Sequence, residues 1–366
     1  MTDRNKHQDK VLRGHTASGL RGMLIGMALG ESMGAARGAL PDTGPLRAGV
    51  CTQLACFTAE GSIRALVRSE HKGICHPPSV LWHAYSRWAT LQGIEADRMR
   101  ARWGESKGDA WPDGWLAQVP ALAERRGSAP ATVQALSAIE QGTVDKPTTA
   151  SRGWHAVGRT LPLAGLGTAE AVRQWDKHAR DIAALTHGDP TAQSAAAHAT
   201  VLTRHCLTGD AVRDALKAGL STLHTTDGTI ADAEHARIAT ALAEAVEHPA
   251  DPARLARLAP DATAPSALLG GLYTAASFPD HADVHAALRF AAAAPDGESV
   301  ACVTGAVLGA THGIEALPLN LVSRHELTWV LDTLARDLLA EVSDAPSGSE
   351  YVQGWDPHWW SRYPGW

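Results

Sequence analysis

The chain has 366 residues, of which 45% are hydrophobic and 20% are charged, a composition typical of a soluble globular protein. Its formal net charge is −6, and no run rich in Lys and Arg is interleaved with aromatic residues, which argues against a nucleic-acid role. The longest apolar segment, residues 299–322, is interrupted by His312, Glu315 and Pro318, so we expect no membrane span either.

The first residues of the chain, MTDRNKHQDK, are polar and contain no apolar signal core. Five dispersed cysteines form no C-x-x-C pair, a pattern that favours reduced thiols and a cytoplasmic protein. We predict a polar leader over residues 1–14, one compact helical domain over residues 15–342 and a tryptophan-rich tail over residues 343–366.

A row of glycines marks the first predicted helix. Gly22, Gly26, Gly30 and Gly34 recur every four residues and therefore share one helix face. Glycine destabilises a helix interior, so the row requires a reason. Close packing against a neighbouring helix is the simpler explanation, and a ligand approaching the helix end beside Glu31 is the alternative.

Alanine-rich segments farther along the chain show helical periodicity. Apolar residues recur at i, i+3 and i+4 in residues 191–206, 229–247 and 325–341, whereas alternating β-branched runs are scarce. Turn clusters at residues 41–45, 112–114 and 346–349 separate the helices, and none is long enough for an interdomain linker. The sequence therefore predicts an all-α fold with a compact arrangement of many helices.

The segment Pro295-Asp296-Gly297-Glu298-Ser299 places two carboxylates and a hydroxyl at the start of an apolar helix that runs to Pro318. Acidic side chains at a helix N-terminus can cap the helix and favour its dipole. The same oxygen atoms can hold a divalent cation. From these residues alone, both interpretations stay open.

The tail carries four of the chain's twelve tryptophans. So much aromatic surface is costly to expose to water, so we expect the tail to pack on the body or on a partner.

The histidines offer a softer metal site as an alternative. His155, His187, His198, His205 and Cys51 could hold zinc, but they lack H-x-x-x-H or C-x-x-C spacing. The pair His281 and His285 has that spacing without the H-E-x-x-H glutamate, and we interpret it as an exposed first helical turn. We expect His187 to contact buried backbone at a helix start.

Five blocks in the same order resemble the ADP-ribosylglycohydrolase family, which includes dinitrogenase reductase-activating glycohydrolase and crystallin J. Residues 21–34 are similar to R-G-x-x-x-G-x-A-x-G-D-x-x-G, and residues 52–60 resemble the segment that normally begins T-D-D-T-Q-M. Residues 151–162 resemble S-K-G-x-G-x-x-M-R-x-x-P, residues 186–190 resemble T-H-x-x-P, and residues 305–318 resemble G-x-x-x-G-A-x-x-G-x-x-x-x-P. Such an ordered set across about 300 residues indicates the fold more strongly than the activity.

This resemblance implies a helical hydrolase with two divalent cations, normally Mg²⁺ or Mn²⁺, that cleaves the glycosidic bond of an ADP-ribosyl group on a side chain or small molecule. It implies metal ligands at Thr52, Asp296, Glu298 and Ser299, and catalytic roles for Glu31, Asp296 and Glu298. It also implies that ADP-ribose, or an ADP-ribosylated substrate, contacts Ser151, Gly153, His155 and Arg159.

The chain departs from the family pattern at the first metal half-site. The positions of T-D-D fall on Gly49, Val50 and Cys51, so both aspartates of that half are absent. Glu31 replaces the usual aspartate, Gly158 replaces a methionine, and Gly38 stands where some members carry a catalytic glutamate.

Two hypotheses follow. The first is metal-assisted hydrolysis by a protein with a degenerate first half-site, which would bind metal weakly or in part. The second is a catalytically inactive relative that serves as an ADP-ribose or nucleotide binding module, or as an interaction scaffold. The sequence leaves the oligomeric state open.

Overall fold

A computed structural model describes residues 3–104, 111–166, 172–223 and 229–365, with side chains described from residue 16 onward except at residues 172–175 and 229–231. Over these ranges the chain is helical, and extended segments meet only in isolated bridges such as Leu46 with His325. The predicted all-α fold is confirmed.

Within the described ranges, ten helices of eleven or more residues form the body: α1 (Asp3–Ala35), α2 (Val50–Lys72), α3 (Pro77–Leu91), α8 (Val172–Ala184), α9 (Pro190–Cys206), α10 (Val212–Thr222), α11 (Thr229–Glu247), α13 (Ala264–Ser277), α15 (Gly297–His312) and α17 (Thr328–Asp344). Shorter helices connect them: α4 (Ala96–Gly104), α5 (Pro120–Ala123), α6 (Pro130–Leu136), α7 (His155–Gly158), α12 (Pro252–Leu258), α14 (Val284–Ala292), α16 (Leu319–Val322) and α18 (Trp359–Arg362). The three periodic segments predicted from the sequence correspond to α9, α11 and α17.

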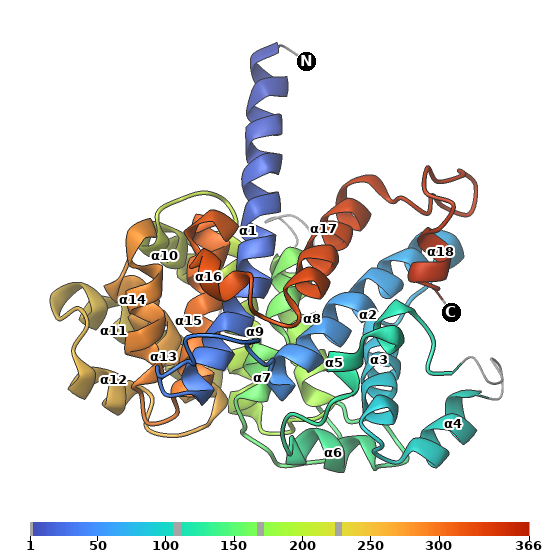
Figure 1. The fold of residues 1–366 in the computed structure, drawn as a ribbon, viewed down its shortest axis with the longest axis horizontal. Helices are drawn as coiled ribbons and strands as arrows, with labels where there is room; N and C mark the ends of the chain where they lie inside the picture. The colour runs from blue at the N-terminus through green and yellow to red at the C-terminus, as the bar shows by residue number, and fades with distance from the viewer. Residues whose placement is uncertain (1–2, 105–110, 167–171, 224–228, 366) are drawn as a thin grey trace.

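The centre of the fold is the contact between α1 and α15, which lie side by side in the middle of the molecule (Figure 1). The α1 glycines face small residues of α15, and a Cβ atom added to Gly26 would lie 2.2 Å from the carbonyl oxygen of Gly305. A Cβ atom on Gly22 would lie equally close to the carbonyl oxygen of Gly309. Close helix packing is therefore the reason for most of the glycine row.

Two groups of helices surround this central pair (Figure 1). On one side α2 packs against α3 and α17, and on the other α13 and α14 pack against α15. The helix α9 contacts α8, α10 and α13, and so joins the two groups. The N-termini of α2 and α15 both lie beside the C-terminal half of α1, and this convergence positions the candidate site.

The tail packs back onto the body, as expected, through part of its aromatic residues. Trp359 and Tyr363 are buried, and the Tyr363 hydroxyl donates a 2.6 Å hydrogen bond to Asp337. Trp355 remains 66% exposed and Tyr351 remains 87% exposed. The expected packing is therefore seen for Trp359 and Tyr363 but not for Tyr351 and Trp355.

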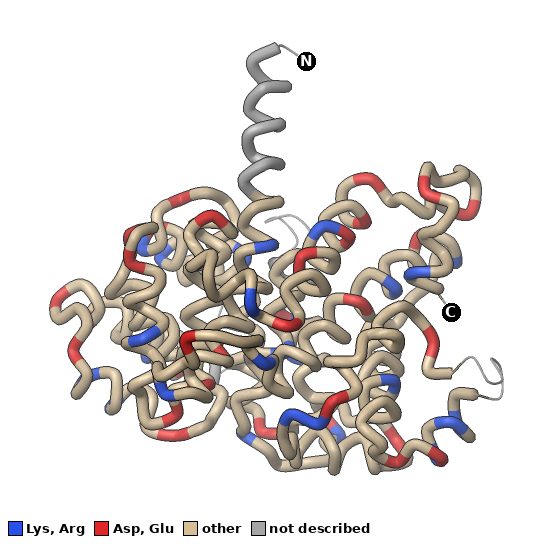
Figure 2. The backbone as a smooth tube through the Cα atoms, in the orientation of Figure 1, with Lys and Arg blue, Asp and Glu red and all other residues tan. Residues whose placement is uncertain are grey.

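Charged residues of both signs are interspersed along the described backbone (Figure 2). No helix among the described residues has the length and hydropathy needed to cross a membrane.

Candidate functional site

The N-terminus of α2 is held by a carboxylate from another helix. Both Glu31 oxygens accept backbone hydrogen bonds, Oε1 from Cys51 and Oε2 from Thr52, each at 2.9 Å. The N-cap residue Gly49 contributes no side-chain cap of its own. Glu31 thus satisfies amide groups that the first turn of a helix leaves without an intrahelical partner.

Glu31 is completely buried, and this position determines its chemistry. Burial raises the pKa of its carboxyl group above 4.5, and hydrogen bonds from Thr52 and Cys51 offset part of that rise. A Cβ atom on Gly49 would lie 2.1 Å from Glu31 Oε1, so only glycine fits at position 49 while the carboxylate stays in place. The catalytic role predicted for Glu31 is not directly tested, but its oxygens are already engaged.

Asp296 does not cap α15 as the simpler interpretation of the sequence proposed. It occupies the N-cap position, yet its side chain makes no capping hydrogen bond. Its Oδ2 atom is buried without a hydrogen-bond partner among the described residues. Because an unsatisfied buried oxygen costs free energy, this atom marks a place for a donor or cation that the protein itself does not supply.

Glu298, in the first turn of the same helix, is half-buried. Burial raises its pKa from 4.5 to about 7, and the nearby carboxylates of Glu31 and Asp296 add to the rise. The carboxylates of Glu31 and Asp296 are therefore close enough to repel that of Glu298. Ser299, also predicted as a ligand, is buried and donates from Oγ to the backbone oxygen of Asp296 at 3.1 Å.

The residues at the first half-site do not fit a bridged pair of cations. Gly49, Val50 and Cys51 offer no side-chain oxygen, and hard cations such as Mg²⁺ and Mn²⁺ take oxygen ligands. Within the part of the chain that the structure describes, no group of three His, Cys, Asp or Glu side chains is arranged to hold a metal ion. Asp296 and Glu298 remain at the start of α15, and Thr52 Oγ1 is buried beside the Glu31 carboxylate.

Sulfur and aromatic groups pack against the first half-site. A Cβ atom on Gly158 would lie 2.3 Å from Cys51 Sγ, 3.0 Å from Trp154 Cζ3 and 3.4 Å from Cys302 Sγ. Burial and the neighbouring Cys302 thiol raise the pKa of Cys51 well above its usual value. Glycine at position 158 and cysteine at position 51 thus depend on each other, and both cysteines are neutral core residues.

The loop that leads into α7 carries the predicted substrate-binding residues Ser151 and Gly153. It is clamped to the turn before α13, since Trp154 N donates to Ala262 O at 3.1 Å and Ala264 N donates to Arg152 O at 2.8 Å. The Ser151 hydroxyl accepts from Gly153 N at 3.2 Å. Ser151 and Gly153 are both partly exposed and can be reached by a ligand.

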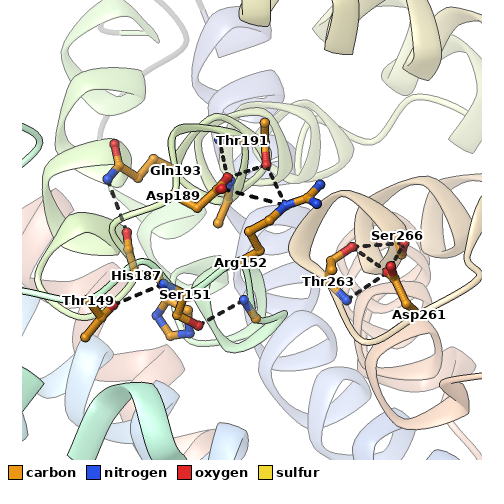
Figure 3. Close-up of polar contacts among 12 residues, drawn as sticks. Thr149, Ser151, Arg152, His187, Asp189, Thr191, Gln193, Asp261, Thr263 and Ser266 are labelled. Atoms are coloured by element: carbon orange, nitrogen blue, oxygen red, sulfur yellow. Dashed lines mark hydrogen bonds and ion pairs between the residues drawn. The ribbon is translucent and has the colours of Figure 1, made fainter. Parts of the chain in front are cut away.

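Two polar clusters fix this loop from outside, and the sequence alone did not reveal them (Figure 3). Arg152 reaches Thr191 Oγ1 at 3.3 Å and the carboxylate of Asp189, which caps α9. On the other side, Thr263 and Ser266 each donate to Asp261 Oδ1 at 2.6 Å. The Arg152 contacts join residues almost forty positions apart, so no local pattern signalled them, whereas the Asp261 cluster lies within six residues of the turn before α13.

The Arg159 side chain is enclosed by groups of the protein itself. The side chain is fully buried, and it donates to Tyr85 Oη and Thr186 Oγ1, both at 2.6 Å, and to the backbone oxygens of Ile182 and Ala183. These contacts tie α7 to the end of α8. The prediction that Arg159 binds substrate stays untested, but its position favours a supporting role.

His155 is more accessible than Arg159. Its ring lies 4.6 Å from that of Trp154 in an edge-on arrangement, and it remains partly exposed. Burial, with the Arg159 charge nearby, lowers its pKa to about 4, so the ring is neutral near pH 7. A neutral imidazole can accept or donate a hydrogen bond to a ligand.

The next histidine, His187, has a structural role. His187 is buried and its Nδ1 lies 2.8 Å from Thr186 Oγ1, and its backbone oxygen accepts from Gln193, so it supports the start of α9 as expected. His281 and His285 are exposed, as predicted. All five cysteines are unpaired.

Comparison with known proteins agrees with this architecture. The sequence model of the ADP-ribosylglycohydrolase family matches residues 14–347. A solved structure titled "ADP-ribosylglycohydrolase-related protein complex" is similar in fold, with a TM-score of 0.57 and 20% identity over 90% of this chain and 99% of that chain. A search of curated proteins gives no significant match.

Proposed function

Because the chain belongs to the ADP-ribosylglycohydrolase family, we propose that it binds a ligand carrying an ADP-ribosyl group and does not hydrolyse it through a two-cation centre. Members of this family are glycohydrolases that act on ADP-ribosylated substrates and generally depend on metal. The proposal places the ligand where α7 meets α15, near Asp296, Glu298 and the partly exposed residues Ser151, Gly153 and His155.

The observation that carries this proposal is the unpartnered Oδ2 atom of Asp296. A ribose hydroxyl is a donor that would satisfy it, and a hydrogen bond to a carboxylate is stronger than one between neutral groups. Glu298, with a pKa near 7, can act as an acceptor when ionised and as a donor when protonated. Neither role requires a cation.

Loss of the two-cation route is supported by the contacts of Glu31. Its two oxygens accept the amides of Cys51 and Thr52, and the neighbouring positions 49–51 hold no oxygen ligand. To replace the missing aspartates, Glu31 would have to bind a cation with oxygens that already cap the start of α2.

A second candidate function is weak hydrolysis supported by a single Mg²⁺ or Mn²⁺ ion. The buried Asp296 Oδ2 atom, which has no partner among the described residues, and the buried Thr52 Oγ1 atom favour it, because both are hard oxygen ligands. Glu298 and Ser299 would complete the partial site. A lone ion would polarise water less than a bridged pair.

Two measurements separate the candidates. Binding is followed by the rise in melting temperature with ADP-ribose, which stabilises the folded state by mass action. Hydrolysis is followed by release of ADP-ribose from ADP-ribosylated arginine, with and without Mn²⁺. We expect stabilisation without release, and Asp296→Asn should reduce the stabilisation whereas the matched exposed variant Asp97→Asn should not. Manganese-dependent release would favour the second candidate, and no stabilisation at millimolar ADP-ribose would contradict the binding proposal.

A cytoplasmic location belongs to the same proposal. Its support is the set of five unpaired cysteines, four of them buried, which is typical of a reducing compartment.

A further inference from the structure

A cavity of about 500 Å³ lies at the opposite end of α2 from the candidate site, and residues of α2, α3, α4 and the C-terminal segment line it. Its walls include Arg64 and Arg68 of α2, Cys75 and His76 before α3, His83 of α3 and Trp103 of α4. Sixteen residues of helix separate Arg68 from Thr52, which corresponds to about 24 Å along the axis. The cavity is therefore distinct from the site described above.

The cavity carries an excess of positive charge. Arg64 is neutralised, because its guanidinium pairs with Glu60 and Asp113, and Arg87 pairs with the same two carboxylates. Arg68, by contrast, donates to the backbone oxygen of Gly365 at 3.3 Å and forms no ion pair with a described residue. The described residues that line the cavity include no Asp or Glu. Its charge therefore favours an anion.

One wall of the cavity is aromatic. The His83 ring lies between two indoles, with its centroid 4.7 Å from that of Trp103 and 4.7 Å from that of Trp111. Trp103 is only partly buried. The Arg102 guanidinium lies over the Trp103 ring, 4.9 Å from its centroid, so a planar ligand would pack against the part of the indole that Arg102 and His83 leave exposed.

We infer that this cavity binds a small aromatic phosphate, with the anion on Arg68 and the planar ring against Trp103. Guanidinium groups form strong charge-assisted hydrogen bonds to phosphate oxygens. A volume of about 500 Å³ lies within the range of small-molecule sites and suits a nucleoside monophosphate. The hydroxyl of Ser79, held 2.8 Å from His76 Nδ1, adds a polar group on the same wall.

Cys75 provides a readout located inside this cavity. It is partly exposed, whereas Cys51, Cys56, Cys206 and Cys302 are buried, so a thiol reagent should label Cys75 first. Burial raises the pKa of its thiol, so labelling is followed at mildly alkaline pH. A Cys75→Ser variant identifies the labelled group. A ligand in the cavity should slow this reaction, and a ligand at the distant candidate site should not.

The experiment measures the labelling rate of the full chain against the concentration of adenosine 5′-monophosphate. Adenosine lacks the phosphate and ribose 5-phosphate lacks the ring, so the two together test both parts of the inference. Arg68→Gln removes the anion contact. Arg213→Gln is the matched control, because Arg213 also donates to a backbone oxygen, that of Ala276, and lies outside the cavity.

We expect saturable protection by the monophosphate, with half-protection shifted about tenfold or more to higher concentration in Arg68→Gln and unchanged in Arg213→Gln. Adenosine and ribose 5-phosphate should each protect about tenfold more weakly than the monophosphate. Absence of protection at millimolar monophosphate overturns the inference. So does protection that Arg68→Gln leaves unchanged, or that adenosine matches. Because the readout is local to Cys75, these results do not depend on ADP-ribose binding near Asp296.

Discussion

The carboxylate of Glu31 accepts a 2.9 Å hydrogen bond from the backbone amide of Thr52, across two helices that are separate in the sequence. This contact caps α2 at the position where the family pattern places its first metal half-site. It joins two departures from that pattern, glutamate at position 31 and the absence of acidic residues at positions 49–51. One carboxylate thus stabilises a helix start at which the resemblance to the family predicts a pair of metal-binding aspartates.

The contact between Glu31 and Gly49 should appear as a strong coupling in unfolding experiments. Gly49→Ala should destabilise the protein by about 1–3 kcal/mol, because the new Cβ atom would lie 2.1 Å from Glu31 Oε1. Glu31→Ala should cost a similar amount, about 1–3 kcal/mol, because two amides lose their acceptor. In the double variant the clash is gone, so urea denaturation should show less than the sum of the two costs. Strictly additive costs would mean that the two residues do not meet.

The acidic cluster should make stability depend on pH through Glu298. Its pKa is raised in the folded state from 4.5 to about 7, so the folded protein holds this proton more tightly than the unfolded chain. Stability from this group therefore falls as pH rises from about 4.5 to about 7, and stays low above that range.

Glu298→Gln removes this loss. Between mildly acidic and mildly alkaline pH, the free energy of unfolding of the variant should rise by about 1–3 kcal/mol relative to that of the parent protein. This figure allows for the partial exposure of the Glu298 side chain. Glu140→Gln, at an exposed site, is the control and should gain nothing. Thermal unfolding at several pH values checks this. An equal stability difference at all pH values would show that the Glu298 carboxyl is not perturbed.

The glycine row of α1 should tolerate no side chain. Gly26→Ala would place a Cβ atom 2.2 Å from the carbonyl oxygen of Gly305, so the two helices would have to separate, at a cost of about 3 kcal/mol or more. In the control, Gly104→Ala, the Cβ atom would meet the flexible Arg100 side chain at 3.3 Å and Trp111 Cβ at an ordinary contact distance of 3.9 Å. Urea unfolding of both variants measures the difference. A Gly26→Ala protein as stable as the control would refute the close approach of α1 and α15.

Restoring the missing aspartates should restore metal binding. In Val50→Asp with Cys51→Asp, new carboxylates would join Glu31, Asp296 and Glu298, so the apo protein should lose stability through like-charge repulsion. Mn²⁺ should then raise the melting temperature of the variant by mass action. The asparagine pair at the same positions has nearly the same shape without the charge and should show no such rise. If the aspartate variant folds but Mn²⁺ does not raise its melting temperature, the cause of weak metal binding lies elsewhere, at Gly38, Gly158 or the loop before α7.

The helical architecture could be predicted from the sequence because its signals are local. The apolar periodicity of residues 229–247 coincides with α11, and the four-residue spacing of the glycines indicated tight packing before their partner helix was known. The retained carboxylates Asp296 and Glu298 could be located for the same reason, since they stand at a recognisable helix start.

What could not be predicted are contacts between distant segments. Nothing near Glu31 in the sequence indicates that its carboxylate caps α2. Nothing near Arg159 indicates that its guanidinium donates hydrogen bonds to Tyr85, Thr186 and backbone oxygens. The interpretation of Asp296 as an N-cap is not supported, because its side chain makes no capping hydrogen bond and its Oδ2 atom has no partner among the described residues.

The most direct test is calorimetric titration of the unaltered protein with Mn²⁺. Because positions 49–51 supply no side-chain oxygen and Glu31 is engaged with backbone amides, the titration should show at most weak binding at a single site, with no micromolar component. Micromolar binding of two Mn²⁺ ions would contradict the proposed loss of the two-cation centre.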